Sequence, residues 1–269
     1  MPQVAAIQMA SGPNVQANLL EAEKLLAQAA DLDAELVVLP ENFSFMGAQE
    51  TDKLEFAEKE GDGLVQNFMR QQARKHGYML VGGTIPLSCD DPGKVRSASL
   101  LYSADGEQIG RYDKVHLFDV QIPDSKDQYA ESEAIQAGDR VACYQTPLGK
   151  LALAVCYDLR FPEHVRSCLD FGMDILAVPS AFTAQTGRAH WEVLLRARAI
   201  ENLSYVVAAA QGGFHVGGRE TWGHSMIIDP WGNVLNSLSK GPGVVTAEIS
   251  LEQLENVRKA FPVLEHRRL

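Results

Sequence analysis

The sequence has no apolar run that reaches the roughly 20 residues needed to cross a bilayer. Its first residues, MPQVAAIQMASGPN, lack an early lysine or arginine, and their apolar run is too short for a signal peptide. The four cysteines, Cys89, Cys143, Cys156 and Cys168, lie far apart and form no CxxC pair. We therefore expect neither a disulfide framework nor a zinc site, and the sequence indicates a cytoplasmic protein with reduced thiols.

Positive charge is also scarce, since 24 Lys and Arg residues face 35 Asp and Glu residues, for a formal net charge of -11. This acidity argues against nucleic acid or an anionic membrane as the partner. The seven histidines show no HExxH or similar ligand spacing, and the glycine-rich GGFHVGG lacks the GK[ST] of a phosphate-binding loop. The sequence thus predicts a protein that uses no metal and no organic cofactor, and whose partner is a small molecule.

What the chain does contain is an alternation of short apolar runs and amphipathic stretches. QVAAIQM, AELVVLPEN, MDILAVPS and SYVVAAAQ are typical of buried strands, and ADGE and PLGK of hairpin turns. Helices are predicted over residues 14–33, 63–77, 188–202 and 251–260, with another after Pro162. Because 269 residues carry no linker and no repeat, we predict one layered α/β domain over residues 1–269. Residues 119–140 read as a long polar loop, of the kind that is often functional.

Three polar residues follow predicted strands, where ligand sites of open α/β sheets lie. They are Glu41 after VVLP, Lys114 after IGRYD, and Cys156 after ALAV. A thiol with its ordinary pKa of about 8.5 is a weak nucleophile until a base takes its proton. A glutamate can take that proton and pass it to a leaving amine, while an ammonium stabilises an oxyanion. Together the three suit attack of a cysteine on an amide, followed by hydrolysis of the thioester.

Each residue also has a simpler interpretation. Glu41 alone is typical of a surface carboxylate, Lys114 of a solvated strand end, and Cys156 of a small core residue. A cysteine–histidine hydrolase would instead use a base such as His116 or His224. Spacing alone leaves these alternatives open.

The segments LPENF, RYDKVHLFD and AVCYDLRFPE resemble, in order, the three signature segments of the nitrilase (carbon–nitrogen hydrolase) superfamily. The likeness extends over essentially the whole chain. It implies a Glu41–Lys114–Cys156 triad, a supporting Glu131, and an oxyanion hole formed by Lys114 and the backbone N–H of Tyr157. It also implies a four-layer α-β-β-α sandwich that forms a homodimer or a higher homo-oligomer, pairing through residues 162–171 and 188–202, with residues 251–269 reaching across the interface.

Within that superfamily the chain is most similar to the deaminated glutathione amidase branch, whose reaction would release 2-oxoglutarate and cysteinylglycine. The neighbouring ω-amidases, which act on α-ketoglutaramate, remain an alternative, as do N-carbamoyl amidases, nitrilases and a noncatalytic binding protein on the same fold. Residues that flank the motifs are candidates for the substrate pocket, although core packing would equally explain most of them. These candidates are Phe43, Met46, Phe182, Thr183 and Arg188.

Overall fold

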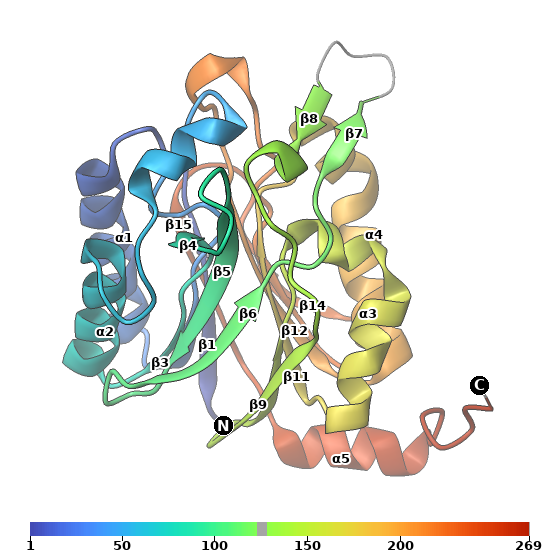
Figure 1. Cartoon of the computed structure of the whole chain (residues 1–269). Coiled ribbons are helices and arrows are strands. Elements are labelled where there is room, and N and C mark those ends of the chain that lie inside the picture. The colour runs from blue at the N-terminus through green and yellow to red at the C-terminus, as the bar shows by residue number, and fades with distance from the viewer. Residues whose placement is uncertain (123–127, 269) are drawn as a thin grey trace.

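The structure is a computed structural model that describes residues 1–122 and 128–268. In this part of the chain the strands form two large sheets that face each other, with helices on the outer face of each (Figure 1). The order of layers is therefore helix, sheet, sheet, helix, which confirms the predicted four-layer sandwich.

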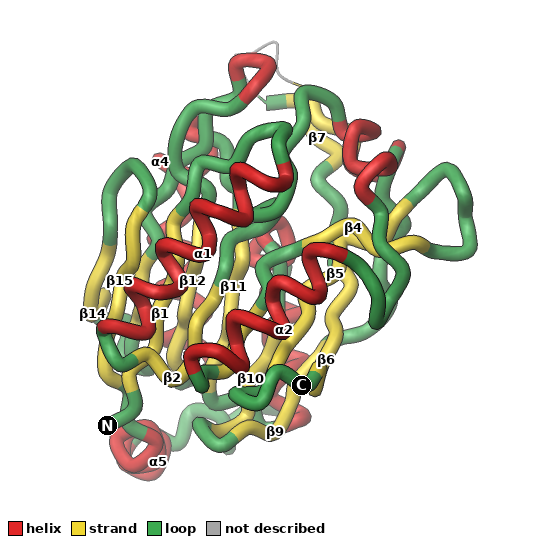
Figure 2. Tube along the Cα trace, turned by 90° about the vertical axis from the view of Figure 1, so that its left-hand side faces the viewer, coloured by secondary structure: helices red, strands yellow, loops and turns green. Residues whose placement is uncertain are grey.

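The first sheet has the strand order β15-β1-β2-β3-β5-β4, with β6 paired to β5. Two helices cover its outer face (Figure 2). Its strands are β1 (Gln3–Gln8), β2 (Ala34–Val38), β3 (Met79–Val81), β4 (Ile85–Ser88), β5 (Val95–Tyr102), β6 (Gln108–Asp113) and β15 (Gly243–Glu248), and its helices are α1 (Val15–Asp31) and α2 (Leu64–His76).

The second sheet has the order β14-β13-β12-β11-β10-β9. Its strands are β9 (Ala142–Thr146), β10 (Gly149–Leu153), β11 (Ile175–Ser180), β12 (Tyr205–Ala210), β13 (Met226–Ile228) and β14 (Val234–Ser237). The remaining elements include helices α3 (Pro162–Ser167), α4 (Ala184–Asn202) and α5 (Leu251–Ala260), and a hairpin of β7 (Asp119–Gln121) and β8 (Gln128–Ala130). No helix in the described residues is long and apolar enough to span a membrane.

Strand β1 shows why its central residues, Val4 to Ile7, are all apolar. Val4 and Ala6 point into the core between the two sheets, whereas Ala5 and Ile7 pack against the helices outside. Successive side chains point to opposite faces of a strand, and both faces are covered here, so no polar alternation survives. Burial of a side chain the size of Val4 or Ile7 contributes roughly 1.5–3 kcal/mol, and that of an alanine methyl group less.

The helix predictions are confirmed with small shifts for α1, α2 and α5. Asn14 caps α1 by accepting a hydrogen bond from the Ala17 N–H at 3.0 Å, and Gly77, with a φ of 72°, ends α2. Helix α4 begins at Ala184, four residues before the predicted start, because the Thr183 side chain caps it by accepting from the Thr186 N–H.

The prediction of one long loop over residues 119–140 is wrong for the described part. Strands β7 and β8 pair as an antiparallel hairpin, and a short 3₁₀ helix covers Glu131–Glu133. Strands of three residues are too short to show periodicity, so the sequence pattern does not reveal them. Residues 123–127 of the predicted loop lie outside the described residues.

Candidate active site

Glu41 lies just beyond β2, on a segment held in place by contacts from both sheets. Its backbone carbonyl accepts a hydrogen bond from Gln211 Nε2 at 3.0 Å, and Gln211 follows β12 of the second sheet. Gly83, after β3, approaches so closely that a Cβ there would lie 2.1 Å from the Pro40 carbonyl oxygen, and its φ is +54°. Only glycine fits that approach without strain. The Glu41 backbone is therefore fixed by residues far away in sequence.

Lys114 follows β6 and is fully buried. Its Nζ lies 2.8 Å from Glu41 Oε1 and 2.8 Å from Glu131 Oε2, and Glu131 Oε2 also accepts from the Phe118 N–H at 2.8 Å. Burial by itself lowers the pKa of Lys114, but the charges of Glu131 and Glu41 outweigh it and hold that pKa well above its usual value. The lysine is therefore an ammonium at neutral pH, clamped between two carboxylates.

Cys156 follows β10 and begins a short 3₁₀ turn over Cys156–Arg160. Its φ of 48° lies in the left-handed region, which costs a non-glycine residue about 1–2 kcal/mol. Such strain is found most often at functional sites. The turn presents a buried thiol, 8% exposed, beyond the carboxyl end of β10, which lies between β11 and β9.

The thiol of Cys156 is neutral in the resting protein. Burial, and then the charge of Glu41, raise the pKa of Cys156 well above its usual value, although Lys114 and a backbone hydrogen bond at Ala181 oppose them. The sulfur therefore becomes nucleophilic when a nearby base takes its proton.

A cavity of about 10 Å³, with room for about one water molecule, connects these groups. The thiol and both carboxylates line it, so three of the four predicted catalytic residues share one cavity, and Lys114 contacts two of them. In the described residues no histidine lines this cavity. His116 and His224, the alternative bases, contact Asp158 and Trp222 instead. This arrangement favours a glutamate over a histidine as the base.

Two of the predicted pocket residues, Phe182 and Thr183, line this cavity, and Met46 lines a larger cavity beside it. Phe43 does not reach either cavity, because its side chain is fully buried in the core behind the first sheet, against Gly83. Arg188 does not reach them either. The early start of α4 places it on the exposed side of the helix, where its guanidinium lies 5.8 Å from the Trp222 ring centre.

The two arginines that do line the cavity are Arg160 and Arg219. Arg160 lies 5.0 Å from the ring centre of Phe182 and bonds the His190 ring at 3.1 Å. Arg219 donates to the Ala181 carbonyl at 3.1 Å. Sequence reasoning missed both, although Arg160 stands within AVCYDLRFPE and Arg219 follows the glycine-rich loop. For Arg160, the signal in the sequence was a charged residue without an assigned role so close to the candidate nucleophile.

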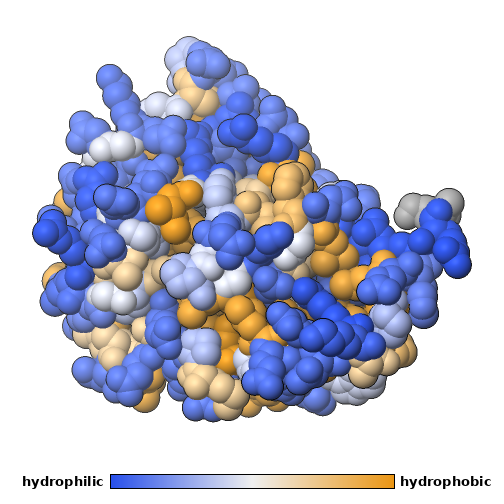
Figure 3. Space-filling view, turned by 90° about the horizontal axis from the view of Figure 1, so that it is seen from below, coloured by the Kyte–Doolittle hydropathy of each residue, from blue (hydrophilic) through white to orange (hydrophobic). Residues whose placement is uncertain are grey.

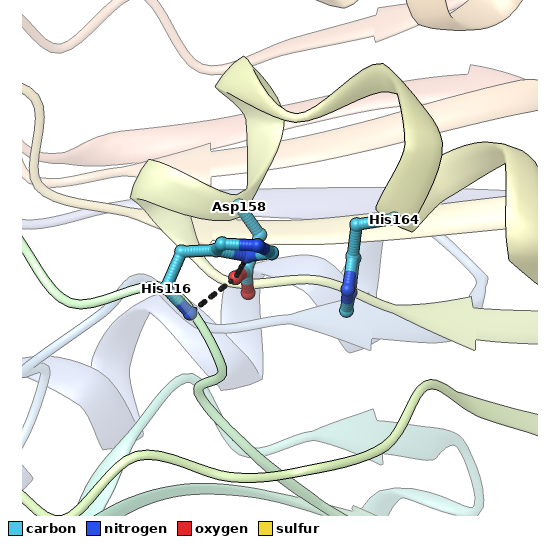
Figure 4. A group of neighbouring side chains, drawn as sticks. All are labelled: His116, Asp158 and His164. Atoms are coloured by element: carbon cyan, nitrogen blue, oxygen red, sulfur yellow. Dashed lines mark hydrogen bonds and ion pairs between the residues drawn. The ribbon is translucent and has the colours of Figure 1, made fainter.

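A second polar cluster lies behind the cysteine turn and brings together His116, Asp158 and His164 (Figure 4). Their ligand-type atoms lie within 4.8 Å of one another, a proximity that the sequence spacing did not predict. Asp158 accepts four hydrogen bonds, from the N–H groups of Val155 and His116, the ring of His116 and the hydroxyl of Tyr112. A carboxylate has about four lone-pair sites, so the protein's own donors use them all. The cluster is suited to holding the turn rather than a metal ion.

Comparison with known proteins agrees with this geometry. Residues 3–259 match the carbon–nitrogen hydrolase family model. The chain is 45% identical over 266 residues to the deaminated glutathione amidase of Synechocystis sp., covering 98% of this chain and 97% of that protein.

Solved structures are also similar. The Caenorhabditis elegans NitFhit protein gives a TM-score of 0.92 at 39% identity, covering 99% of this chain and 65% of that one. Saccharomyces cerevisiae Nit3, a member of branch 10 of the nitrilase superfamily, gives 0.88 at 30% identity, covering 100% and 97%. Fold, family model and near-full-length identity agree, and the chain belongs to the carbon–nitrogen hydrolase family.

Proposed function

We propose that this hydrolase cleaves a linear amide through a thioester on Cys156. The observation that carries the proposal is the buried Lys114 ammonium, which is held by Glu41 and Glu131 beside the cavity that the neutral thiol lines. Complete burial of a cation is costly unless the cation is paired, and packing of the core alone does not require a buried lysine. Its use is to meet negative charge that develops in the cavity.

In the proposed mechanism Glu41 takes the Cys156 proton as the sulfur attacks the amide carbonyl. The carbonyl oxygen becomes an oxyanion, stabilised by the Lys114 ammonium and the Tyr157 backbone N–H. Glu41 then gives its proton to the departing amine, and the acyl group remains on the sulfur. In the second half Glu41 takes a proton from water, which attacks the thioester; the carbon–sulfur bond breaks, the acid is released, and Glu41 returns its proton to the Cys156 sulfur. Glu131 acts as a positioning residue, because it holds Lys114.

We further propose that the amide is deaminated glutathione, which is split into 2-oxoglutarate and cysteinylglycine. The acyl half carries a carboxylate, and Arg160 is a cation at the cavity whose polar partner in the described residues is the ring of His190. An arginine binds a carboxylate through two parallel hydrogen bonds. The cavity is small as it stands, so entry of the acyl chain requires the flexible side chains of Arg160 and Arg219 to move.

The test is a panel of substrates compared by kcat/KM: deaminated glutathione, α-ketoglutaramate and simple aliphatic amides. We expect deaminated glutathione to exceed α-ketoglutaramate by at least about tenfold, since a carboxylated leaving group offers more contacts. A preference for α-ketoglutaramate would identify an ω-amidase. Activity on nitriles, carbamoyl compounds or simple amides alone would reject the keto-acid substrate, and no turnover of any amide would support a binding protein.

We also propose that the protein is a cytoplasmic homodimer that pairs through α3, the 3₁₀ turn Cys168–Phe171 that follows it, and α4. Phe171 is 55% exposed and Val193 is 69% exposed, so both present apolar surface that a second copy of the chain would cover. Apolar side chains also lie exposed among polar ones on the face that carries α5 (Figure 3). Phe261, directly after α5, is 49% exposed, and its ring centre lies 5.5 Å from that of Trp231. Light scattering should give twice the chain mass, and Val193→Glu should halve it.

A further inference from the structure

A second, larger cavity of about 230 Å³ lies beside the cavity at Cys156. Three separate segments build it: the chain that follows Glu41, the start of β8, and the loop that leads to Arg219. The residues that the argument uses are Asn42, Ala48, Glu50, Lys53, Tyr129 and Arg219. Neither the catalytic mechanism nor the acyl half of the substrate accounts for this space.

The two cavities are neighbours, because Arg219 lines both of them. Its guanidinium donates to the Ala181 carbonyl on the side of Cys156 and lies 5.0 Å from the Tyr129 ring centre on the other side. Asn42, the residue after Glu41, also lines the larger cavity. The larger cavity therefore opens on the side of the cysteine where Glu41 lies.

The proposed mechanism places the leaving nitrogen of the substrate on that side. Glu41 donates a proton to the departing amine, so the nitrogen must lie next to Glu41 when the carbon–nitrogen bond breaks. The oxyanion faces Lys114, and the acyl chain takes the remaining direction. Any group carried on the nitrogen then extends past Glu41 toward the larger cavity. We propose that this cavity is the subsite for the amine half of the substrate, an inference that rests on the proposed amidase function.

The charges in the cavity indicate what kind of amine it takes. Lys53 Nζ lies 2.9 Å from Glu50 Oε2, and Arg219 Nη1 lies 3.8 Å from Glu50 Oε1. Burial raises the pKa of Glu50, but the charges of Lys53 and Arg219 outweigh it, and the net pKa is lowered. Glu50 is thus anionic at neutral pH, and two cations face one anion.

One positive charge remains for a ligand. Arg219 Nε is also buried, with no hydrogen-bond partner among the residues that the structure describes. A buried donor without a partner is costly, and a ligand acceptor would remove that cost. The cavity therefore fits an amine that ends in a carboxylate, such as a short peptide, rather than ammonia.

The experiment compares amides that share the oxoglutaryl group and differ in the amine: α-ketoglutaramate, deaminated glutathione, and deaminated glutathione with its glycine carboxylate converted to an amide. In the wild-type enzyme, loss of the carboxylate should lower kcat/KM by about tenfold, a typical value for one charge-assisted contact. This arm needs no variant.

The variants are Lys53→Gln, which removes a cation, and Ala48→Phe, which fills the cavity, with Lys24→Gln on the exposed face of α1 as the matched control. The ratio of kcat/KM for deaminated glutathione to that for α-ketoglutaramate should fall about tenfold in the first two and stay unchanged in the control. Lys53→Gln should also abolish the difference between the acid and the amidated substrate.

Unchanged ratios in both folded variants, together with equal turnover of acid and amidated substrate, would overturn the subsite while leaving the amidase function standing. Turnover of none of the three amides by the wild-type enzyme would overturn both. The two failures are therefore distinguishable.

Discussion

Two buried polar clusters lie on the same two chain segments but differ in the role of their charged groups. We call Glu41, Lys114, Glu131 and Cys156 the reactive cluster, and Asp158 with Tyr112 and His116 the anchoring cluster. In the reactive cluster Lys114 contacts Glu41 and Glu131, and the carboxylates line a cavity with the cysteine. In the anchoring cluster Asp158 accepts hydrogen bonds from Tyr112 and His116, two residues on either side of Lys114. Neither Asp158 nor its partners line that cavity. Burial and charge alone do not distinguish a reactive site from a structural one; the cavity that the carboxylates share with the thiol does.

The anchoring cluster explains how the reactive one keeps its geometry. Tyr112 and His116 lie on the segment that carries Lys114, and Asp158 lies on the turn that carries Cys156. Asp158 also accepts from the Val155 N–H at 2.8 Å, directly before the strained cysteine. The carboxylate thus ties the ammonium segment to the thiol turn and stabilises the unusual backbone of the turn.

The largest expected effect is that of Cys156→Ala. Loss of the nucleophile should lower kcat/KM by at least about 10³-fold, with little change in the melting temperature. Cys168→Ala is the matched control, since Cys168 is also buried and belongs to the hydrophobic core. It should cost about 1 kcal/mol of stability and leave kcat/KM nearly unchanged. Near-normal activity of Cys156→Ala would show that the cluster around Cys156 is not the reactive one.

Asp158→Asn should have the next largest effect. An amide cannot accept all four hydrogen bonds, so we expect a loss of about 1–3 kcal/mol in the free energy of unfolding. Because the turn then shifts against Lys114, kcat should fall more than KM rises. Denaturant unfolding and steady-state kinetics measure both, with the exposed Asp139→Asn as the control. A stable Asp158→Asn variant with full kcat would show that the turn does not need the anchor.

Tyr112→Phe removes one hydroxyl from the anchoring cluster and should cost about 1 kcal/mol of stability. The hydroxyl donates to Asp158 at 2.6 Å and touches no group of the reactive cluster among the described contacts. We therefore expect kcat to stay within about threefold of the wild-type value, which is about 0.6 kcal/mol. A loss of activity as large as that of Cys156→Ala would mean that Tyr112 takes part in the chemistry.

The smallest expected effect concerns how the contribution of Asp158 to the free energy of unfolding changes at acid pH. Burial raises the pKa of Asp158, but hydrogen bonds from His116 and Tyr112 and the charge of His164 outweigh it, so the net pKa is lowered from 3.8. Such a group stabilises the fold above its unfolded pKa, and this contribution is lost as the pH falls through the folded pKa. The difference in stability between wild type and Asp158→Asn should therefore narrow below about pH 4. A constant difference down to pH 2 would exclude this linkage.

The sequence was sufficient for the layers of the fold and for the residues at three strand ends. Glu41, Lys114 and Cys156 follow short apolar runs, and the family resemblance implies their roles. The sequence did not predict contacts that join segments far apart in the chain. Nothing local shows that Arg160 and Arg219 line one cavity, or that Asp158 holds both sides of Lys114.

The pocket predictions show the same limit. Thr183 and Phe182 line the cavity at Cys156 because they follow a buried strand, β11, at the same end of the sheet. Phe43 and Arg188 do not line the described cavities, for geometric reasons that lie elsewhere in the chain. Gly83 allows the core to close over Phe43, and the Thr183 cap starts α4 early enough to turn Arg188 outward.

The most direct test asks whether the substrate acyl group becomes covalently attached to Cys156. The wild-type enzyme is used and quenched within the first turnovers, before water has cleared the thioester; Glu41→Gln, which cannot take the thiol proton, is the control and should carry no adduct. After incubation with deaminated glutathione and rapid acid quench, mass spectrometry should find the oxoglutaryl mass on the peptide that contains Cys156. The same increment on another peptide, or turnover by Cys156→Ala without any adduct, would contradict the account.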